Sequence, residues 1–219
     1  SFIYPNASKQ VLNKISIEIP INKKIGIVGP TGSGKSTLVD LILGLISPTS
    51  GNIFLDGSPV TLFNSPGWTN SIGFVPQKIT LFDDSVKNNI AVGQTDDSID
   101  FNNVKRAAKL AQIDEFIEND LSESYETQIG EDGINLSGGQ RQRIGLARAL
   151  YNSPSVLIFD EATSALDKNT EKKFFNAIFE SMHDITIFFI THNIETTSEC
   201  DFVLVLDDGE IVESGKFDY

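Results

Sequence analysis

The sequence KIGIVGPTGSGKST, residues 24–37, decides the fold of this chain. Its first part, KIGIVG, is a short apolar run of the kind that forms a buried strand. A glycine-rich loop follows, and leucine and isoleucine then recur at helical spacing until Gly44 and Pro48 end the pattern. The segment therefore predicts a strand, a loop and a helix, which is the opening unit of an α/β fold.

The loop matches the pattern G-x-x-x-x-G-K-[ST]. Its glycines let backbone N–H groups converge on phosphate oxygens, and the N-terminus of the following helix adds positive potential. Lys35 supplies a point charge to the terminal phosphates, and Ser36 is placed to ligate Mg²⁺. A glycine-rich turn can be purely structural, but the full match between a strand and a helix favours phosphate binding. The predicted binding residues of the loop are Gly29, Pro30, Thr31, Gly32, Ser33, Gly34, Lys35, Ser36 and Thr37.

Further strands are predicted on both sides of this unit. The runs VLIFD at 156–160 and ITIFFI at 185–190 are continuously apolar, as expected of parallel strands buried on both faces, and the helical sequence 170–182 separates them. Alternation in VLNKISIEIP at 11–20 and the segment GNIFLDG at 51–57 predict antiparallel strands near the N-terminus. The end of the chain predicts a hairpin turned at Asp208-Gly209.

Strand-like runs are missing from about residue 76 to about residue 150, where FNNVKRAAKLAQIDEFIEND at 101–120 has helical spacing. We expect a helical lobe here, whose final helix begins at a second glycine-rich segment, NLSGGQRQR at 135–143. The predicted fold is α/β, a P-loop NTPase core with a mostly parallel sheet. An antiparallel β subdomain lies at its N-terminus, and an α-helical subdomain is inserted into a single domain spanning 1–219.

Polar residues follow two of the predicted buried strands. Asp160 ends one run and Glu161 comes directly after it, at the sheet edge where open α/β sheets bind ligands. Asp160 would hold Mg²⁺, and Glu161 would polarise the attacking water. His192 should emerge at the same edge, although a histidine at a strand end is often structural. Gln77 stands where the core gives way to the helical lobe; its amide could coordinate Mg²⁺ or orient water, or simply belong to a turn.

Composition excludes several functions. The net charge of −13 argues against a nucleic-acid partner, because such binding draws most of its affinity from clustered Lys and Arg. Cys200 is the only cysteine, which rules out an intramolecular disulfide. The apolar stretch LVDLILGLI is too short to span a bilayer. Since the sequence starts at Ser1 inside a strand-like segment, we expect a domain cut from a longer protein.

Taken in order, these motifs resemble the nucleotide-binding domain of ABC transporters over essentially the whole chain. The matching motifs are Walker A at 29–37, the Q-loop Gln77, the signature LSGGQ at 136–140, Walker B VLIFDE at 156–161, the D-loop SALD at 164–167, and the switch histidine His192. Each short motif is moderately specific, but six in this order are hard to obtain by chance.

The resemblance implies an ATPase in which two domains pair head to tail around two ATP molecules. The signature then faces the Walker A site of the other domain. Ser137, Gly138, Gly139 and Gln140 join the nucleotide-binding set, and Asp167 helps to couple the two sites. Mg²⁺ would be held by Ser36, Gln77 and Asp160, and the catalytic residues would be Lys35, Gln77, Glu161 and His192.

Other features resemble exporters in particular. Tyr4 matches the aromatic position that stacks on adenine, although an edge-strand tyrosine is the alternative. Glu131, in TQIGEDGINLSGGQ, matches a charged position that touches the membrane domain, and 37–57 is similar to bacterial lipid-linked oligosaccharide flippases. Asn193 departs from the arginine that follows the switch histidine in many exporters. The implied partners are a second nucleotide-binding domain, either an identical chain or a different one, and a transmembrane domain, at the cytoplasmic face of the inner membrane.

Two alternatives use the same ATPase fold. A nucleic-acid machine or translation factor would carry coiled-coil insertions, tandem copies or basic arms, none of which this acidic sequence shows. A regulatory nucleotide sensor would need a damaged hydrolytic carboxylate, and the presence of Glu161 argues against it. The cargo is not predicted, because specificity would reside in the membrane domain.

Overall fold

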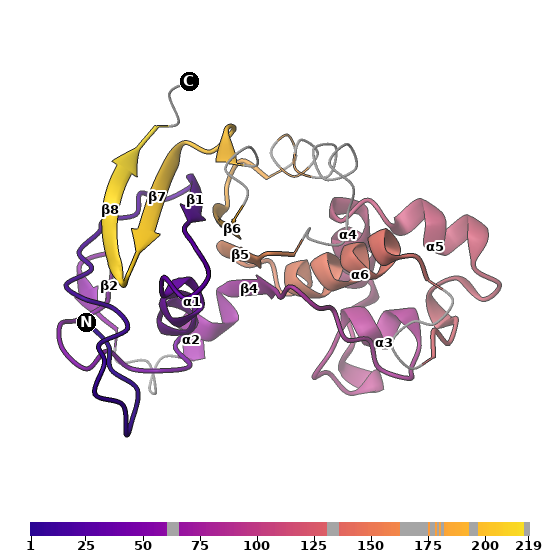
Figure 1. Cartoon of the computed structure of the whole chain (residues 1–219). Coiled ribbons are helices and arrows are strands. Elements are labelled where there is room, and N and C mark those ends of the chain that lie inside the picture. Colours follow the sequence, from indigo (N-terminus) through magenta and orange to yellow (C-terminus); the bar gives the residue numbers. More distant parts are fainter. Residues whose placement is uncertain are drawn as a thin grey trace. The chain divides into compact units, whose positions relative to one another are not determined.

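The computed structural model of the chain describes residues 1–60, 66–130, 136–162, 182–192 and 197–216, together with 175, 178 and 180. The chain divides into two compact units (Figure 1). Unit 1 comprises Ser1–Ile72 and Ile185–Tyr219, and unit 2 comprises Gly73–Asp184.

Unit 1 is built on strands β1 (Lys24–Val28), β6 (Thr186–Thr191), β7 (Phe202–Asp207) and β8 (Glu210–Gly215). β6 and β7 flank β1 and run parallel to it, while β8 pairs antiparallel with β7. The apolar residues of β1 and β6 are buried, as expected of strands covered on both faces. The predicted α/β class with a mostly parallel sheet is confirmed.

The helix predicted after the glycine loop is α1 (Lys35–Leu43). It ends at Gly44, whose left-handed backbone, with φ 75°, is the usual C-terminal stop of a helix. The short helix α2 (Pro66–Asn70) lies beyond it in unit 1, and Trp68 Nε1 donates a hydrogen bond of 2.8 Å to the carbonyl of Ile42.

The N-terminal antiparallel sheet is present but smaller than expected. It consists of β2 (Phe54–Leu55) and β3 (Ser58–Pro59). The predicted strand over 11–20 is wrong, because only Leu12 within it forms a bridge, to Phe2. Lys14 has a φ of 47°, which breaks an extended run, so the alternation of apolar residues after it does not build a strand.

Unit 2 contains strands β4 (Ile72–Val75) and β5 (Val156–Asp160), which are neighbours in a sheet. Its helices are α3 (Val86–Ile90), α4 (Phe101–Leu110), α5 (Asp114–Asp120) and α6 (Gly138–Leu150), with 3₁₀ turns at Asp96–Ser98 and Ser124–Glu126. No strand occurs among the described residues between 76 and 150, so the predicted helical subdomain is confirmed. Its last helix begins inside the second glycine-rich segment, also as predicted.

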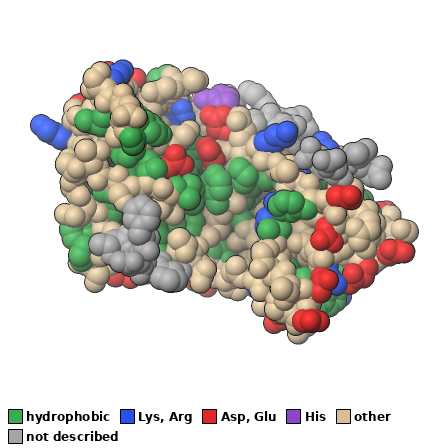
Figure 2. All heavy atoms as spheres, turned by 90° about the horizontal axis from the view of Figure 1, so that it is seen from below, with side chains coloured by type: hydrophobic (Ala, Val, Ile, Leu, Met, Phe, Trp, Pro, Cys, Tyr) green, Lys and Arg blue, Asp and Glu red, His purple; other side chains and the backbone are tan. Residues whose placement is uncertain are grey.

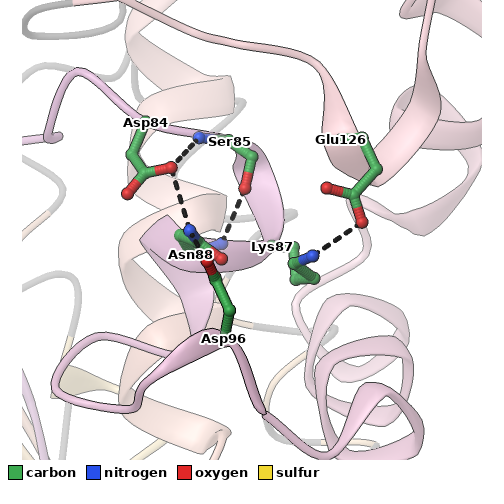
Figure 3. A network of polar contacts seen from close by, with 6 residues as sticks. All are labelled: Asp84, Ser85, Lys87, Asn88, Asp96 and Glu126. Carbon is green, nitrogen blue, oxygen red and sulfur yellow. Dashed lines mark hydrogen bonds and ion pairs between the residues drawn. The ribbon is translucent and has the colours of Figure 1, made fainter.

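Polar contacts fix the start of α3 (Figure 3). Ser85 caps the helix by accepting a hydrogen bond of 3.1 Å from the backbone N–H of Asn88. Asp84 accepts from the N–H of Ser85 and from the side chain of Asn88, which also donates to Asp96. α6 is tied to the same region, because Arg148 Nε donates to the carbonyl of Asn89 at 2.8 Å. The helices of unit 2 are therefore held together by partly buried polar contacts as well as by apolar packing.

The surface of unit 2 is acidic. Acidic side chains, drawn red, outnumber basic ones on the face of its helices seen in Figure 2. This distribution is in keeping with the net charge of −13. Within the described part of the chain, no helix combines the length and the apolar character needed to cross a bilayer.

Candidate nucleotide-binding and catalytic site

The glycine loop of unit 1 folds around the ammonium group of a lysine. Lys35, the first residue of α1, is only 8% exposed, and its Nζ donates to the carbonyl oxygens of Gly29 at 2.7 Å and Pro30 at 2.9 Å. An ammonium group has three donors, so one is left for a further acceptor. The side chain is thus positioned by the loop rather than extended into solvent.

Two glycines of the loop are required by contacts within unit 1. A Cβ on Gly29 would lie 2.1 Å from the carbonyl oxygen of Leu206. Gly34 has a φ of 105°, and a Cβ there would lie 2.7 Å from Cδ2 of Leu12. Because Gly34 also precedes α1 without a side-chain cap, the first-turn N–H groups of the helix remain available to an anion.

The β7–β8 turn, which lies far away in the sequence, is hydrogen-bonded to this loop and supports it. The backbone N–H of Gly209, in the β7–β8 turn, donates to the carbonyl of Ser33 at 3.0 Å, and the Gly209 carbonyl accepts from Asn13 at 2.8 Å. A Cβ on Gly209 would lie 2.3 Å from the carbonyl oxygen of Val11. The turn therefore fits between the loop and the N-terminal segment. Beside it, the hydroxyl of Ser33 is buried and has no hydrogen-bond partner among the described residues.

Tyr4 lies next to the start of α1. Its hydroxyl shares a hydrogen bond of 3.1 Å with the hydroxyl of Thr37, and its ring meets the edge of Phe2 at a centroid distance of 4.9 Å. Tyr4 as a residue is 40% exposed, so its side chain is open to contact with another flat group. Ser36, the second residue of α1, is exposed, unlike its neighbours Lys35 and Thr37.

His192 comes directly after β6, at the same sheet edge as the loop. In the parallel register of β1 and β6, Val28 is opposite Thr191, so Gly29 and His192 leave the sheet side by side. The His192 side chain is exposed. Unit 1 thus brings together Tyr4, the glycine loop and this histidine.

In unit 2 the structure pairs two of the predicted site residues. Asp160 is the last residue of β5, and Glu161 follows it with a φ of 48°, an uncommon backbone conformation for a residue with a side chain. Gln77 Nε2 donates to Oε2 of Glu161 at 3.0 Å. Backbone strain of this kind is often retained where it positions a functional group.

The signature segment forms the start of α6. Ser137 caps the helix by accepting from the N–H of Gln140 at 3.2 Å, and the Gln140 side chain accepts from the N–H of Ser137 at 2.7 Å. Gly138 differs from Gly29 and Gly34, because a Cβ on it would meet no atom of the described residues within 4 Å. Asp167 and Glu131, along with Asn193, lie outside the described residues.

Two contacts near these residues were not predicted from the sequence. One is the brace from Gly209 to the loop, and the other is Gln142, which is buried in α6 and donates to the carbonyl of Ala162, the residue after Glu161. Gln142 is spaced four and eight residues before the buried Leu146 and Leu150, so helical periodicity already placed it on the buried face.

Comparisons with known proteins agree with this arrangement. The family described as ABC transporter matches residues 12–164. An uncharacterized ABC transporter ATP-binding protein of Bacillus subtilis, YfiB, is 45% identical over 215 residues, covering 98% of this chain and 37% of that protein. The ATP-dependent lipid A-core flippase of Pseudomonas aeruginosa is 44% identical over 216 residues, covering 99% of this chain and 36% of that protein.

A solved structure gives the same result for the fold. The chain matches a bacterial Atm1-family ABC exporter with ATP bound with a TM-score of 0.86 and 37% sequence identity, over 98% of this chain and 37% of that one. The chain therefore spans little more than a third of the length of these relatives.

Proposed function

Because this chain belongs to the ABC transporter family, we propose that it is the ATP-binding and ATP-hydrolysing domain of an exporter or flippase. One observation carries the proposal: the Lys35 ammonium is held inside a glycine loop at the N-terminus of α1, with one donor left over. We also propose that 1–219 is one ATP-binding domain, with its helical subdomain at about 76–150.

The residues present fit ATP and Mg²⁺. Lys35 and the uncapped N–H groups of the loop and α1 would bind the β- and γ-phosphates, and the exposed part of the Tyr4 ring would stack on adenine. The hydroxyl of Ser36, the amide oxygen of Gln77 and the carboxylate of Asp160 are hard oxygen ligands of the type that suits Mg²⁺. The bound metal would neutralise charge on the phosphate oxygens.

Hydrolysis would proceed by in-line attack of water on the γ-phosphorus. The water oxygen forms the new P–O bond, the bond to the β–γ bridging oxygen breaks, and Glu161 orients the water and accepts its proton. Gln77 would hold the Glu161 carboxylate in the orientation for this step through their 3.0 Å hydrogen bond. Lys35 and His192 would stabilise the charge on the γ-phosphate.

A second copy of the domain completes the proposed site. Ser137, Gly138, Gly139 and Gln140 would contact the γ-phosphate bound to the partner's Lys35, in a head-to-tail dimer, and Asp167 would couple the two sites. The open space around Gly138 supports this arrangement, because nothing within the described part of the chain explains why a side chain is missing there. The whole transporter would include a transmembrane domain and would place this domain at the cytoplasmic face of the inner membrane.

The substitution Glu161→Gln tests the proposal. It keeps the size of the side chain but removes the base, so hydrolysis of Mg-ATP should fall by about 10²–10⁴-fold while ATP binding survives. Trapped ATP should then join two chains, and light scattering should show a dimer with Mg-ATP and a monomer without it. Salt should be moderate, since two chains at −13 each repel.

The control is the double variant Lys35→Ala with Glu161→Gln, which should stay monomeric in Mg-ATP. Normal turnover by Glu161→Gln would remove Glu161 from the mechanism. Tight ATP binding without dimer formation would contradict the head-to-tail arrangement.

A further inference from the structure

α6 buries a single polar side chain. Gln142 is 5% exposed and is the only polar residue among the buried positions of this helix. Its Nε2 donates to the carbonyl oxygen of Ala162, also in unit 2, but its Oε1 is buried and has no hydrogen-bond partner in the described part of the chain. An unpaired buried acceptor destabilises a fold, so packing alone does not account for a glutamine at this position.

The hydrogen bond from Gln142 reaches a backbone segment under strain. Glu161, one residue before Ala162, has a φ of 48°, which an L-residue keeps only when its surroundings enforce it. Relaxation of Glu161 to a negative φ would turn the following peptide groups and displace the Ala162 carbonyl. A donor fixed on that carbonyl opposes this relaxation.

Glu161 is thereby held from two sides. Gln77 binds its carboxylate at 3.0 Å, and Gln142 binds the backbone just after it. The two glutamines come from different segments, because Gln77 follows β4 and Gln142 belongs to the helix that begins at the signature segment. A helix transmits a shift of its first turn along its length, so movement at Ser137 would reach the Ala162 carbonyl through Gln142.

We propose that Gln142 is a positioning residue for Glu161 and ties the signature helix to the hydrolytic carboxylate of the same chain. The proposal rests on the proposed ATPase function. Gln142 itself touches neither nucleotide nor water; it acts by keeping Glu161 in its left-handed conformation.

The first test is Gln142→Met in the full chain. Methionine fills a similar volume without a donor and without the unpaired acceptor. We expect a thermal midpoint equal to or above that of the wild type, an affinity for Mg-ATP within about twofold, and a kcat about tenfold or more lower, because small misplacements of catalytic groups slow the chemical step.

The matched control is Leu146→Ala, four residues further along the buried face of α6. It should lower the thermal midpoint by several degrees, because it opens a cavity in the core, and leave kcat within about twofold when measured well below that midpoint. A purely structural role for Gln142 predicts that Gln142→Met behaves like this control.

Gln142→Glu supplies an independent readout. A buried carboxyl has a raised pKa, and its protonated form can donate to the Ala162 carbonyl as the amide does, whereas its ionised form cannot. The ratio of its kcat to that of the wild type should therefore rise as the pH falls from about 8 to about 6. The thermal midpoint of Gln142→Glu must be measured at the same pH values, because an ionised buried carboxylate also destabilises the fold; the inference requires the kcat ratio to change under conditions where the chain stays folded.

Each outcome separates the two proposals. If the wild-type chain does not hydrolyse Mg-ATP, the proposed function is wrong and this inference falls with it. If the wild type hydrolyses ATP and Gln142→Met has the same kcat, or loses kcat only in step with its thermal midpoint, the inference alone is wrong. If Gln142→Met does not fold, a pH-independent ratio for Gln142→Glu overturns the inference in the same way.

Discussion

The two glycine-rich segments of the chain have different reasons for their glycines. In the glycine loop at residues 29–37, called the P-loop below, a side chain on Gly29 would collide with Leu206 and one on Gly34 with Leu12, both of the same unit. In the signature segment, a Cβ on Gly138 would meet no atom of the described residues within 4 Å. The serine of that segment is explained locally, because Ser137 caps α6 together with Gln140.

Contacts within unit 1 explain Gly29 and Gly34, whereas no contact in the described part of the chain explains Gly138. Gly29 and Gly34 of the P-loop are already required for unit 1 to pack, so these two glycines say little about ligands by themselves. Gly138 costs helix stability relative to alanine and brings no contact within the described part of the chain in return. The proposed head-to-tail dimer would give Gly138 a reason, because a partner's nucleotide would then approach the start of α6 closely.

Among the changes that test this comparison, the largest effect is expected from Lys35→Ala. Its ammonium is fixed by the carbonyls of Gly29 and Pro30, so its loss removes a preorganised charge rather than a mobile one. Turnover of Mg-ATP should fall by about 10²–10³-fold, the usual loss when one preorganised donor to a transition state is removed. Steady-state phosphate release measures it. Unchanged turnover would show that the loop is only a structural turn.

Alanine at the two kinds of glycine sharpens the comparison directly. Gly34→Ala should destabilise unit 1 by at least about 1–2 kcal/mol, because its φ of 105° disfavours any side chain and Leu12 blocks the new methyl group. Gly138→Ala should leave the free chain as stable as before or up to about 1 kcal/mol more stable, since alanine is the better helix former. Its ATP-dependent dimer and turnover should nevertheless be lost.

Cys200 can report these stabilities. It is buried in unit 1, and burial raises the pKa of its thiol to about 12, so the folded chain should resist thiol reagents at a pH of about 8. Labelling of Cys200 should speed up in Gly34→Ala and stay at the wild-type rate in Gly138→Ala. If Cys200 of Gly138→Ala is labelled faster than in the wild type, Gly138 is also needed for stability. If Gly138→Ala has normal turnover, Gly138 is not needed for the reaction. Either result would contradict the difference between the two segments.

Mixed chains test whether the signature acts on the partner. A chain carrying both Lys35→Ala and Ser137→Arg, in about fivefold excess over the wild type, should lower wild-type turnover about sixfold, because only about one partner in six is then wild type and each site of a mixed dimer has one damaged half. Two chains that each carry one of the substitutions should regain part of the activity when mixed. If wild-type turnover is unchanged by the excess double variant, each chain hydrolyses ATP without a partner.

The smallest effect concerns Tyr4. Loss of ring stacking in Tyr4→Ala should weaken nucleotide binding by roughly 1 kcal/mol, or about fivefold in the dissociation constant, and leave kcat nearly unchanged. Tyr4→Phe keeps the ring and loses only the hydrogen bond to Thr37, so its affinity should stay within about twofold. Titration with a fluorescent ATP analogue measures the dissociation constants of both variants. If Tyr4→Phe weakens binding as much as Tyr4→Ala, the hydroxyl and not the ring contributes to nucleotide affinity.

Segments governed by their own residues were predicted well. The strand at 156–160 has the predicted bounds, β6 is displaced by one residue, and the hairpin turns at Asp208-Gly209. The start of α6 in the signature segment was predicted from the glycine-rich segment that leads into a helical run; the Ser137–Gln140 capping box that fixes it is a further local feature. The family follows from the same short motifs.

Features that depend on distant contacts were missed. The segment 11–20 has the alternation of a strand, yet its backbone N–H groups at Val11 and Asn13 bind Phe2 and Gly209 instead, and Lys14 turns the chain away. Neither the brace of Gly209 on the P-loop nor the reach of Gln142 to Ala162 has a local signature. The roles assigned to the site residues remain predictions that the experiments above address.

The contact of the Asp208-Gly209 turn with the P-loop also has a consequence for translation, because the two segments are synthesised at different times. Residues 29–37 are translated on the order of ten seconds or more before residue 209, at about 5–20 residues per second. Until that turn emerges, the carbonyl of Ser33 and the N–H of Asn13 lack the partners they have in the finished domain. The P-loop of a nascent chain would therefore gain this support only after residue 209 has emerged, well after the signature segment at 136–140 has been made.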